Sequence, residues 1–397
     1  PWLDLSTIPT WDRIAGWYLD MSEGQIEMTP DVTAKAEELV QDCETDEEKI
    51  AAIFDFVANS INYESVPFFQ TAYVPRLPGE VLQDGFGDCK DKSCLMITML
   101  KTVGIDDLHF ALVTPGAPSG RPFLPSPRFN HAIVCRKSWD GDMTWYDPTY
   151  EMAEPNQVPG YLGGTLALVI DDDTISLSVI PRENVGDWPY SSRAELEIAT
   201  EGTAEISLTE DYQQIDQVAA LRQRLDGEDE DELVSYMSRN LAIRYPGVMV
   251  DSVRVEGMEP GQGKLQVRTD FQVPDFGYVD QGILSVKFPW SSQLASVYGT
   301  VAADRHRETL LDLNALALCE NDEVTLTLPE SIRMERLPEG VSLVWKGCEY
   351  TTTYTETTGG MVATRTLNIE GSLVSLKNYP DFKAWFDKVR RDLDMSL

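Results

Sequence analysis

The stretch from Gly85 to Gly104 constrains the fold most, because a glycine-containing turn leads directly into an amphipathic helix. Apolar residues recur at helical spacing through the second half of this stretch, and Gly104 supplies a stop signal. Asp88 is a good N-cap residue, and Asp91, three positions later, can complete a capping box. The sequence therefore predicts a largely buried helix that begins at Cys89.

Cys89 would occupy the first position of this helix. There its sulfur faces unpaired backbone amides and the positive end of the helix dipole, both of which favour a thiolate over a thiol. Glycines at positions 85 and 87 allow a substrate to approach the backbone closely. A single cysteine is more often a small buried apolar residue. The nucleophile interpretation therefore depends on finding a base.

Histidines are scarce, which narrows the search for that base to His109, His131 and His306. His131 begins a strand-like run, and a second short run, 143–146, leads to Asp147 immediately before a proline. If these strands pair antiparallel, the Asp147 carboxylate can fix the tautomer of His131, whose ring faces Cys89. A lone strand histidine is usually structural. The matching order of Cys89, His131 and Asp147 favours a catalytic triad.

Composition limits the possible partners. The chain has 397 residues, 42% of them hydrophobic, and a formal charge of −34 from 66 acidic and 32 basic residues. Nucleic acid and anionic lipid are disfavoured because both would be repelled. No run approaches the ~18 apolar residues that a membrane-spanning helix needs. The six cysteines lack the spacing of a disulfide scaffold or a zinc site, although a Cys319–Cys348 bridge is conceivable.

The first half of the chain reads as an α+β domain, residues 1–185. Helical periodicity covers 30–43 and 46–61, where Thr45 and Glu48 form a capping-box pattern, and a proline-rich loop runs from 62 to 82. Five strand-like runs follow the Cys89 helix, at 108–114, 130–136, 143–147, 166–170 and 175–180. Helices first and antiparallel strands later are typical of the α+β class.

Residues 186–397 read as a β-rich region, with the boundary in the segment 181–189. A hairpin and a pair of helices, 212–225 and 230–244, precede about seven alternating strands that suggest a sandwich-like arrangement. An amphipathic helix at 381–394 closes the chain. This region could divide further into 186–300 and 301–397.

Three local motifs resemble the bacterial transglutaminase-like superfamily, whose core is a papain-like cysteine-enzyme fold. They are Gly87-Asp88-Cys89-Lys90-Asp91-Lys92-Ser93, Asn130-His131-Ala132 and Tyr146-Asp147-Pro148-Thr149. The resemblance covers about residues 1–185 and extends to multidomain members with a C-terminal β-rich module. It implies a nucleophile at Cys89, a base at His131, an acid at Asp147 and an oxyanion-hole donor at Gln70. It also implies export to the periplasm or the exterior of a bacterium, with a cytoplasmic location left open.

The expected function is cysteine-dependent acyl transfer on peptide or protein amides, through a thioester at Cys89. Water as the acceptor would give a peptidase or amidase, and an amine would give a crosslinking enzyme. This chemistry needs no metal or organic cofactor, and the sequence has no HExxH motif of a zinc hydrolase. The alternative is a non-enzymatic module that binds a peptide or glycan and retains a vestigial triad.

Overall fold

The computed structural model describes residues 5–65, 73–115, 124–155, 157–171, 176–259, 262–280, 283–286, 288, 290, 307–314, 317–332 and 336–393. The chain forms two compact units. The first unit comprises Pro1–Glu183 with two later segments, Ile215–Arg224 and Glu259–Gly263, and the second unit comprises the rest. The predicted boundary near 181–189 lies where the chain first leaves the first unit, but the return of two later segments was not anticipated.

Except for α6 (Ile215–Leu225), the described helices of the first unit precede its main sheet in the sequence. They are α1 (Trp11–Ser22), the short 3-10 helix η1 (Glu23–Gln25), α2 (Pro30–Leu39), α3 (Asp46–Ser60), α4 (Pro78–Asp84) and α5 (Cys89–Thr102). The predicted capping box of α3 is present, with Thr45 and Glu48 each bonding the other's backbone. The helix α4 corrects the predicted 62–82 loop. Proline is tolerated at the first position of a helix, which is where Pro78 lies.

The main sheet of the first unit is antiparallel, with strand order β5-β4-β3-β6-β7. Its strands are β3 (Leu108–Val113), β4 (His131–Lys137), β5 (Met143–Tyr146), β6 (Leu166–Ile170) and β7 (Ser176–Val179). A separate parallel pair joins β1 (Asn62–Tyr63) to β2 (Phe86–Gly87), just before α5. The predicted helices-then-strands order is confirmed, so the first unit is α+β.

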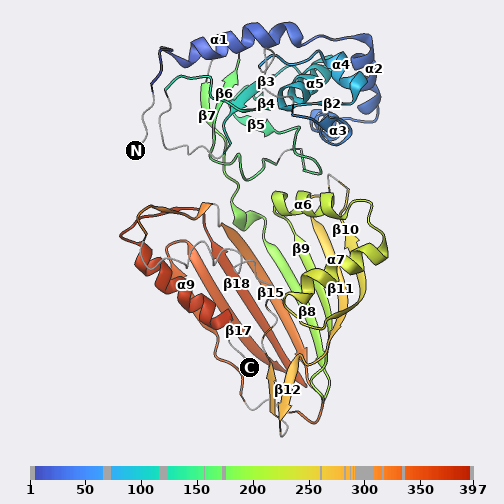
Figure 1. Ribbon diagram of the computed structural model, residues 1–397, viewed down its shortest axis with the longest axis vertical. Helices are drawn as coiled ribbons and strands as arrows, with labels where there is room; N and C mark the ends of the chain where they lie inside the picture. Colours follow the sequence, from blue (N-terminus) through green and yellow to red (C-terminus); the bar gives the residue numbers. More distant parts are fainter. Residues whose placement is uncertain are drawn as a thin grey trace. The chain divides into compact units, whose positions relative to one another are not determined.

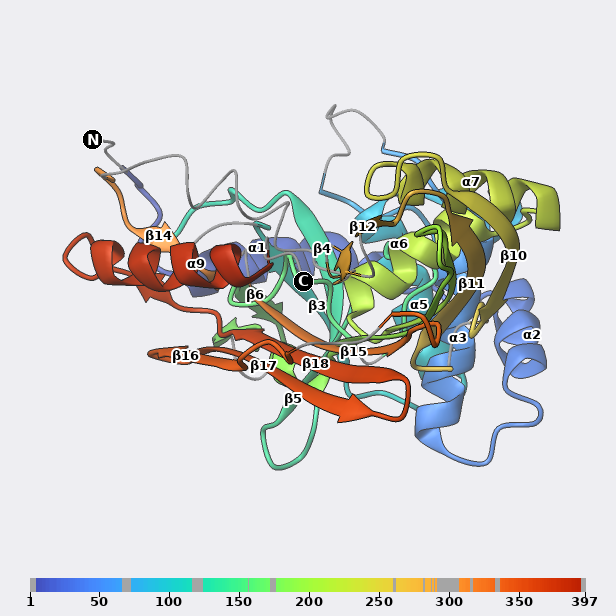
Figure 2. The same ribbon diagram turned by 90° about the horizontal axis from the view of Figure 1, so that it is seen from below.

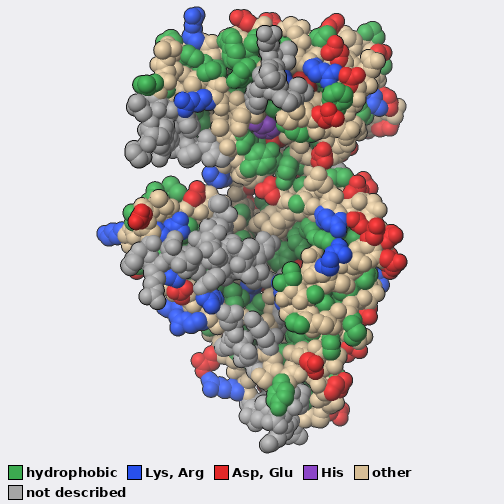
Figure 3. Space-filling view, in the orientation of Figure 1, with side chains coloured by type: hydrophobic (Ala, Val, Ile, Leu, Met, Phe, Trp, Pro, Cys, Tyr) green, Lys and Arg blue, Asp and Glu red, His purple; other side chains and the backbone are tan. Residues whose placement is uncertain are grey.

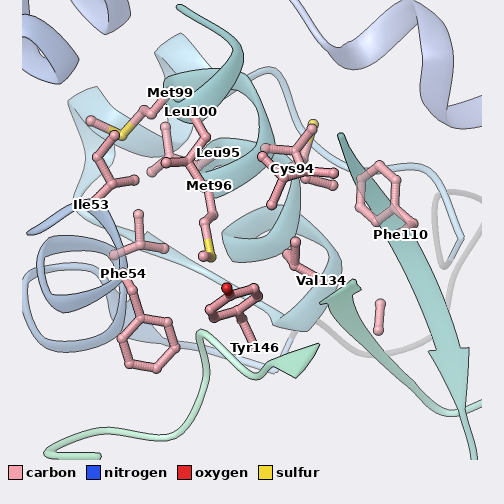
Figure 4. Close-up of a cluster of buried hydrophobic side chains, with 14 of the residues drawn as sticks. Ile53, Phe54, Cys94, Leu95, Met96, Met99, Leu100, Phe110, Val134 and Tyr146 are labelled. Atoms are coloured by element: carbon pink, nitrogen blue, oxygen red, sulfur yellow. The ribbon is translucent and has the colours of Figure 1, made fainter. Parts of the chain in front are cut away.

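The helix α5 lies at the centre of the core of the first unit. Its residues 94–100 are fully buried, and it packs against α3 and α2 on one side and against β4 and β3 on the other. Figure 4 shows Met96 reaching from α5 toward the ring of Tyr146, with Phe54 of α3 beside it. Burial on all sides fixes the position and direction of α5, and therefore the position of the residue at its start.

Both faces of the sheet are covered. Alternate residues of β3 and β4, such as Phe110 and Val134, face the helices, while Ala111 and Ile133 belong to a second cluster with Trp145 and Leu162. Strands buried on both faces explain why these runs are almost continuously apolar in the sequence.

The second unit is built on one eight-stranded sheet with strand order β10-β11-β9-β8-β15-β18-β17-β16. The strands are β8 (Tyr190–Ile198), β9 (Ala204–Tyr212), β10 (Met249–Glu256), β11 (Leu265–Val273), β15 (Leu318–Thr327), β16 (Val341–Trp345), β17 (Cys348–Thr357) and β18 (Gly360–Ile369). Among the described residues, the smaller elements are the 3-10 helix η2 (Val185–Asp187), the strand pair β12 (Gly277–Asp280) and β13 (Ile283–Val286), and the strand pair β14 (Leu311–Asp312) and β19 (Leu373–Val374). A β-rich second half is confirmed, and Figure 2 shows its curvature from β16 to β10.

Two helices, and not a second sheet of equal size, cover one face of this sheet within the described residues. The helices α7 (Glu230–Ala242) and α9 (Tyr379–Leu393) both lie in front of the strands in Figure 1. The two helices cover the same face of the sheet. Ala363 of β18 belongs to the buried cluster that includes Leu241 of α7, and Leu367, four residues along the same strand, belongs to the cluster that includes Phe386 of α9. The parallel pairing of β8 with β15 joins strands from both sides of residue 300 in one sheet.

Cys319 and Cys348 do not form the bridge considered from the sequence, because both are free thiols. Leu318 and Cys348 are both paired with Ile369 on β18 and face the buried side. Cys319 follows Leu318 and therefore points to the opposite side of the sheet. Acidic side chains are spread over both units on the face shown in Figure 3 and do not gather in one cluster there.

Candidate active site

Cys89 begins α5, as predicted. The Asp88 carboxylate accepts hydrogen bonds from the amides of Lys90 (3.1 Å) and Asp91 (3.3 Å), and the Asp91 carboxylate accepts one from the Asp88 amide (3.3 Å). This capping box uses the amides of the flanking residues and does not use that of Cys89. The Cys89 side chain is partly buried, at the positive end of the helix.

The turn before Cys89 is held from two directions. Gly87 pairs with Tyr63, and its carbonyl accepts a hydrogen bond from the Glu64 amide (3.1 Å). A Cβ atom added at Gly87 would lie 2.8 Å from the Cβ of Asp91, so only glycine fits at this position without a shift of the backbone. Asp91 in turn accepts a bond from the Arg76 amide (2.9 Å). The backbone around the cysteine is therefore fixed by close packing and not by the cap alone.

Two lysines of the motif are buried in the structure. Lys90 pairs with Asp88 and lies 3.8 Å from Asp91. The amine of Lys92 donates hydrogen bonds to the carbonyl oxygens of Ala58 (3.1 Å) and Ile61 (2.7 Å), at the end of α3. Burial lowers the pKa of Lys92 to about 8, although the charges of Glu151 and then Asp147 oppose this shift. Lys92 thus caps the C-terminal end of α3 by binding its carbonyl oxygens, a role that the sequence did not predict.

His131 and Asp147 meet as predicted from the pairing of β4 with β5. The two strands are antiparallel, with Val134 opposite Tyr146, which brings the start of β4 beside the residue that follows β5. The His131 Nε2 atom lies 2.8 Å from the Asp147 Oδ2 atom. The Asp147 carboxylate is almost completely buried. A buried carboxylate at this distance fixes which ring nitrogen of His131 carries a proton.

Four donors surround the Asp147 carboxylate. Its Oδ1 atom accepts from the hydroxyl (2.6 Å) and the amide (3.1 Å) of Thr149. Its Oδ2 atom accepts from His131 and from the Tyr161 hydroxyl (2.7 Å). Burial alone would raise the pKa of Asp147, but the charge of His131 and these hydrogen bonds hold it below its usual value. Asp147 is therefore an anion, and His131 donates from Nε2.

The proton affinity of His131 is raised by the groups around it. Burial would lower the pKa of its imidazole, but the charge and hydrogen bond of Asp147, and after them the hydrogen bond and charge of Cys89, raise it to about 10. The Cys89 sulfur also acts on the imidazole of His131, by hydrogen bond and by charge. His131 is thus bonded both to an acid and to the cysteine.

His109, the other histidine in the described ranges, does not join this cluster. His109 lies on β3 opposite Cys135, and Trp145 packs in the cluster on the outer sheet face. Gln70 and His306 lie outside the described residues, so the oxyanion-hole role of Gln70 stays a prediction. In the part of the chain that the structure describes, no group of three or more His, Cys, Asp or Glu side chains is arranged to hold a metal ion.

Comparison with known proteins identifies the fold of this unit. The family model of the transglutaminase-like superfamily matches residues 33–107, which include α3 and α5. The first unit carries a transglutaminase-like core. The resemblance inferred from the three motifs is confirmed. A domain of unknown function (DUF3858) matches residues 290–397, at the end of the β-rich second unit.

Several solved structures match the chain, and two of them are compared with it below. The crystal structure of a "putative protease" from Parabacteroides distasonis superposes with a TM-score of 0.56 at 14% identity, covering 98% of this chain and 59% of that chain. At this identity the likeness shows the fold alone, and the chain spans about three-fifths of that protein. Legionella pneumophila LapG covers 36% of this chain and 75% of its own at 15% identity, and its TM-score of 0.23 supports no inference. No curated protein matches the sequence.

Membrane-spanning helices were disfavoured by the sequence. None of the helices in the described ranges is long and apolar enough to cross a bilayer.

Sequence reasoning missed two residues beside the transglutaminase-like core's His131–Asp147 pair. Tyr161 reaches Asp147 from the loop after β5, and Asp216 of α6 (Ile215–Leu225) binds that loop. Tyr161 lies in no recognisable motif, and Asp216 lies in the predicted 212–225 helix, where nothing marks it as a contact of the site. Gly160 beside Tyr161 was the only local signal, because glycine often marks a close approach of the backbone to another group.

Proposed function

We propose that the chain is a cysteine-dependent acyl-transfer enzyme that acts on amide groups of peptides or proteins. Cys89 is the nucleophile and His131 is the proton carrier. Asp147 orients the imidazole of His131 and stabilises its protonated form. The observation that carries the proposal is the continuous hydrogen-bonded sequence from Cys89 through His131 to an ionised Asp147, at the start of a buried helix.

The reaction follows from these positions. The Cys89 sulfur attacks the amide carbonyl carbon, and the carbonyl oxygen becomes an oxyanion beside the Cys89 backbone amide. His131 gives its proton to the departing nitrogen, the C–N bond breaks, and an acyl thioester remains on Cys89. Water or a second amine then loses a proton to His131 and attacks the thioester, which releases the product and restores the Cys89 thiolate.

The protonation of His131 supports this order of steps. Because the His131 pKa is raised to about 10, its imidazole holds a proton at neutral pH. A protonated imidazole beside a cysteine stabilises the thiolate and is ready to protonate a leaving amine. The proposal assigns this chemistry to the predicted domain 1–185, and assigns no catalytic residue to 186–397.

Selective alkylation of Cys89 tests the nucleophile. Treatment with limiting iodoacetamide at pH 7, followed by peptide mass spectrometry, should label Cys89 well ahead of the other five cysteines. Cys94 is the internal control, because it lies on the same helix but is fully buried, and burial raises its pKa to about 12. Equal labelling of all accessible cysteines would contradict the proposal.

A peptide library tests the reaction. Wild-type protein should release amine products from the library, and Cys89→Ala should abolish release while still binding the same peptides. Addition of a primary amine separates the two outcomes, because a crosslinking enzyme would incorporate the amine and a peptidase would not. Binding that is identical in both proteins, with no turnover in either, would favour the peptide- or glycan-binding module.

A further inference from the structure

The Asp147 Oδ2 atom is shared between two donors. His131 Nε2 lies 2.8 Å from this atom and the Tyr161 hydroxyl lies 2.7 Å from it. Burial, followed by the charge of Asp147, raises the pKa of Tyr161 well above its usual value, so the hydroxyl remains a donor throughout the working pH range. The oxygen that holds the His131 proton is therefore also hydrogen-bonded by a permanent neutral donor.

Asp216 holds the segment that carries Tyr161. Both carboxylate oxygens of Asp216 accept from the amide of Gly160 (3.2 and 3.1 Å), the residue directly before Tyr161. The same carboxylate accepts from the Tyr150 hydroxyl (2.7 Å), and the Tyr150 ring packs edge-on against the Tyr161 ring at 6.2 Å. Asp216 thus fixes both the backbone before Tyr161 and the ring beside it.

A side chain at position 160 would displace the Asp216 carboxylate. A Cβ atom at this position would lie 2.5 Å from an oxygen of Asp216. A second anchor lies farther along α6, where the fully buried Arg222 donates to Glu154 (3.1 Å) and to the carbonyl of Met152 (3.2 Å). The residues of α6 up to Arg224 belong to the first unit although they follow β9 of the second. A segment distant in sequence is therefore built against the loop beside the site.

We propose that Asp216 is a positioning residue that places the Tyr161 hydroxyl on Asp147, and that this shared carboxylate sets how strongly His131 holds its proton. The consequence for catalysis rests on the proposed function, in which His131 must release its proton to the leaving amine. The position of Asp216 gives α6 a role in the chemistry without contact with the reacting atoms.

The direction of the effect follows from electrostatics. The Tyr161 hydrogen bond to Asp147 is stronger when His131 is neutral, because the carboxylate charge is then not compensated by an imidazolium. Tyr161 therefore favours the neutral form of His131 and lowers its proton affinity below what Asp147 alone would give. Removing the hydroxyl should make His131 a weaker acid.

Several titratable groups act on the His131–Asp147 pair and on Cys89, and each can influence the pKa of His131. Asp147 and Cys89 act directly on His131; Tyr161, Tyr150 and Lys92 interact with Asp147; Tyr63 and Tyr18 interact with Cys89. The variants below change only the groups at Asp216 and Tyr161, so a shift that they cause is assigned to those groups.

The test is an NMR titration of the His131 imidazole in the full chain between pH 8 and 11. The sequence has only three histidines, so labelled histidine gives a simple spectrum, and His131→Gln assigns the resonance. Tyr161→Phe should raise the His131 midpoint by roughly half a unit to one unit. Asp216→Ala should give a similar rise, and the double variant should rise no further than the larger single variant.

Matched controls lie in the second unit. Tyr350→Phe removes a tyrosine-to-carboxylate bond of the same length, 2.7 Å to Asp392, and Asp270→Ala removes a carboxylate that accepts from Ser207 and Ser252. Both controls should leave the His131 midpoint unchanged. Gly160→Ala, which displaces the Asp216 carboxylate, is a second way to open the contact if Asp216→Ala folds poorly.

Three results would overturn the inference. An unchanged midpoint in Tyr161→Phe removes Tyr161 from the network, and an unchanged midpoint in Asp216→Ala and Gly160→Ala removes Asp216. Additive shifts in the double variant show that Asp216 does not act through Tyr161. Since the titration needs no turnover, its failure is distinct from failure of the proposed function, which is measured by Cys89 alkylation and peptide release in the wild-type protein.

Discussion

Replacing Asp147 by asparagine should slow the reaction of Cys89 with iodoacetamide by a factor that depends on pH. Asparagine keeps the size of the side chain but removes the charge that holds the proton on His131. In the wild-type protein the His131 pKa is raised to about 10, after burial is offset by Asp147 and Cys89. Without the anion, the pKa should return toward the ordinary value of about 6.5. The reactive pair would then lose its imidazolium near neutral pH.

The magnitude follows from these two values. At pH 7.5 the wild-type imidazole is almost fully protonated, whereas a group with a pKa of about 6.5 is about 9% protonated, so the rate should fall roughly tenfold. At pH 5.5 the variant regains most of its imidazolium, and the gap should close to less than about twofold. A raised folded-state pKa also means that the His131–Asp147 pair stabilises the fold below about pH 6.5 and that this contribution fades as pH rises through about 10.

The assay is the second-order rate constant of Cys89 alkylation, measured by mass spectrometry from pH 5.5 to 7.5. Asp107→Asn is the matched control, because Asp107 also accepts from a basic side chain, Arg136, at 2.9 Å in the same unit. A tenfold gap that is the same at every pH would point to structural damage and refute the electrostatic reasoning. Rates within twofold of wild type at pH 7.5 would refute it as well.

Three further substitutions test the supports of the site and the second unit. Gly87→Ala should destabilise the first unit by about 1–3 kcal/mol, because the added Cβ would lie 2.8 Å from the Cβ of Asp91. Hydrogen exchange of the α5 amides should then become faster, and an unchanged exchange rate would contradict the packing argument. Lys92→Met should alter the pH dependence of α3 exchange. Because the Lys92 pKa is lowered to about 8 from 10.5, the wild type should gain about 3 kcal/mol relative to the variant between pH 8 and 10.5, and a flat difference would show that burial does not lower this pKa. Arg365→Met should lower the stability of the second unit by about 3–5 kcal/mol, measured by hydrogen exchange of β15 and β18, because it leaves Glu320 and Asp322 buried without their cation. Alkylation of Cys89 should stay at the wild-type rate, and a slower rate would show an unexpected dependence on this cluster.

Local sequence patterns determined the parts of the site that depend on neighbouring residues. The capping boxes at Thr45 and Asp88 were predicted and are present, because a cap is formed by residues three positions apart. The strand that begins at His131 and the strand that leads to Asp147 were also predicted, since a short hairpin brings its two ends together without help from distant residues. The motifs then identified the transglutaminase-like core.

The tertiary structure decided what comes from a distance. The helix α4 begins at Pro78, where the number of prolines suggested a loop, and burial of Val81 against the core outweighs that signal. The β-rich region was predicted, but the pairing of β8 with β15 joins residues about 130 positions apart, which no local pattern encodes.

The site around Cys89 best illustrates the difference between what local sequence determines and what only tertiary packing decides. The sequence placed Cys89 at the start of a helix and named His131 and Asp147 as its partners, because caps, strand periods and motif residues are local signals. Only the folded chain brings the Tyr161 hydroxyl to Asp147 and Asp216 to the adjacent backbone, through a contact that spans 56 positions. Such a contact depends on how α6 packs, and packing of that kind is set by the shape of the whole unit and not by the sequence around either residue.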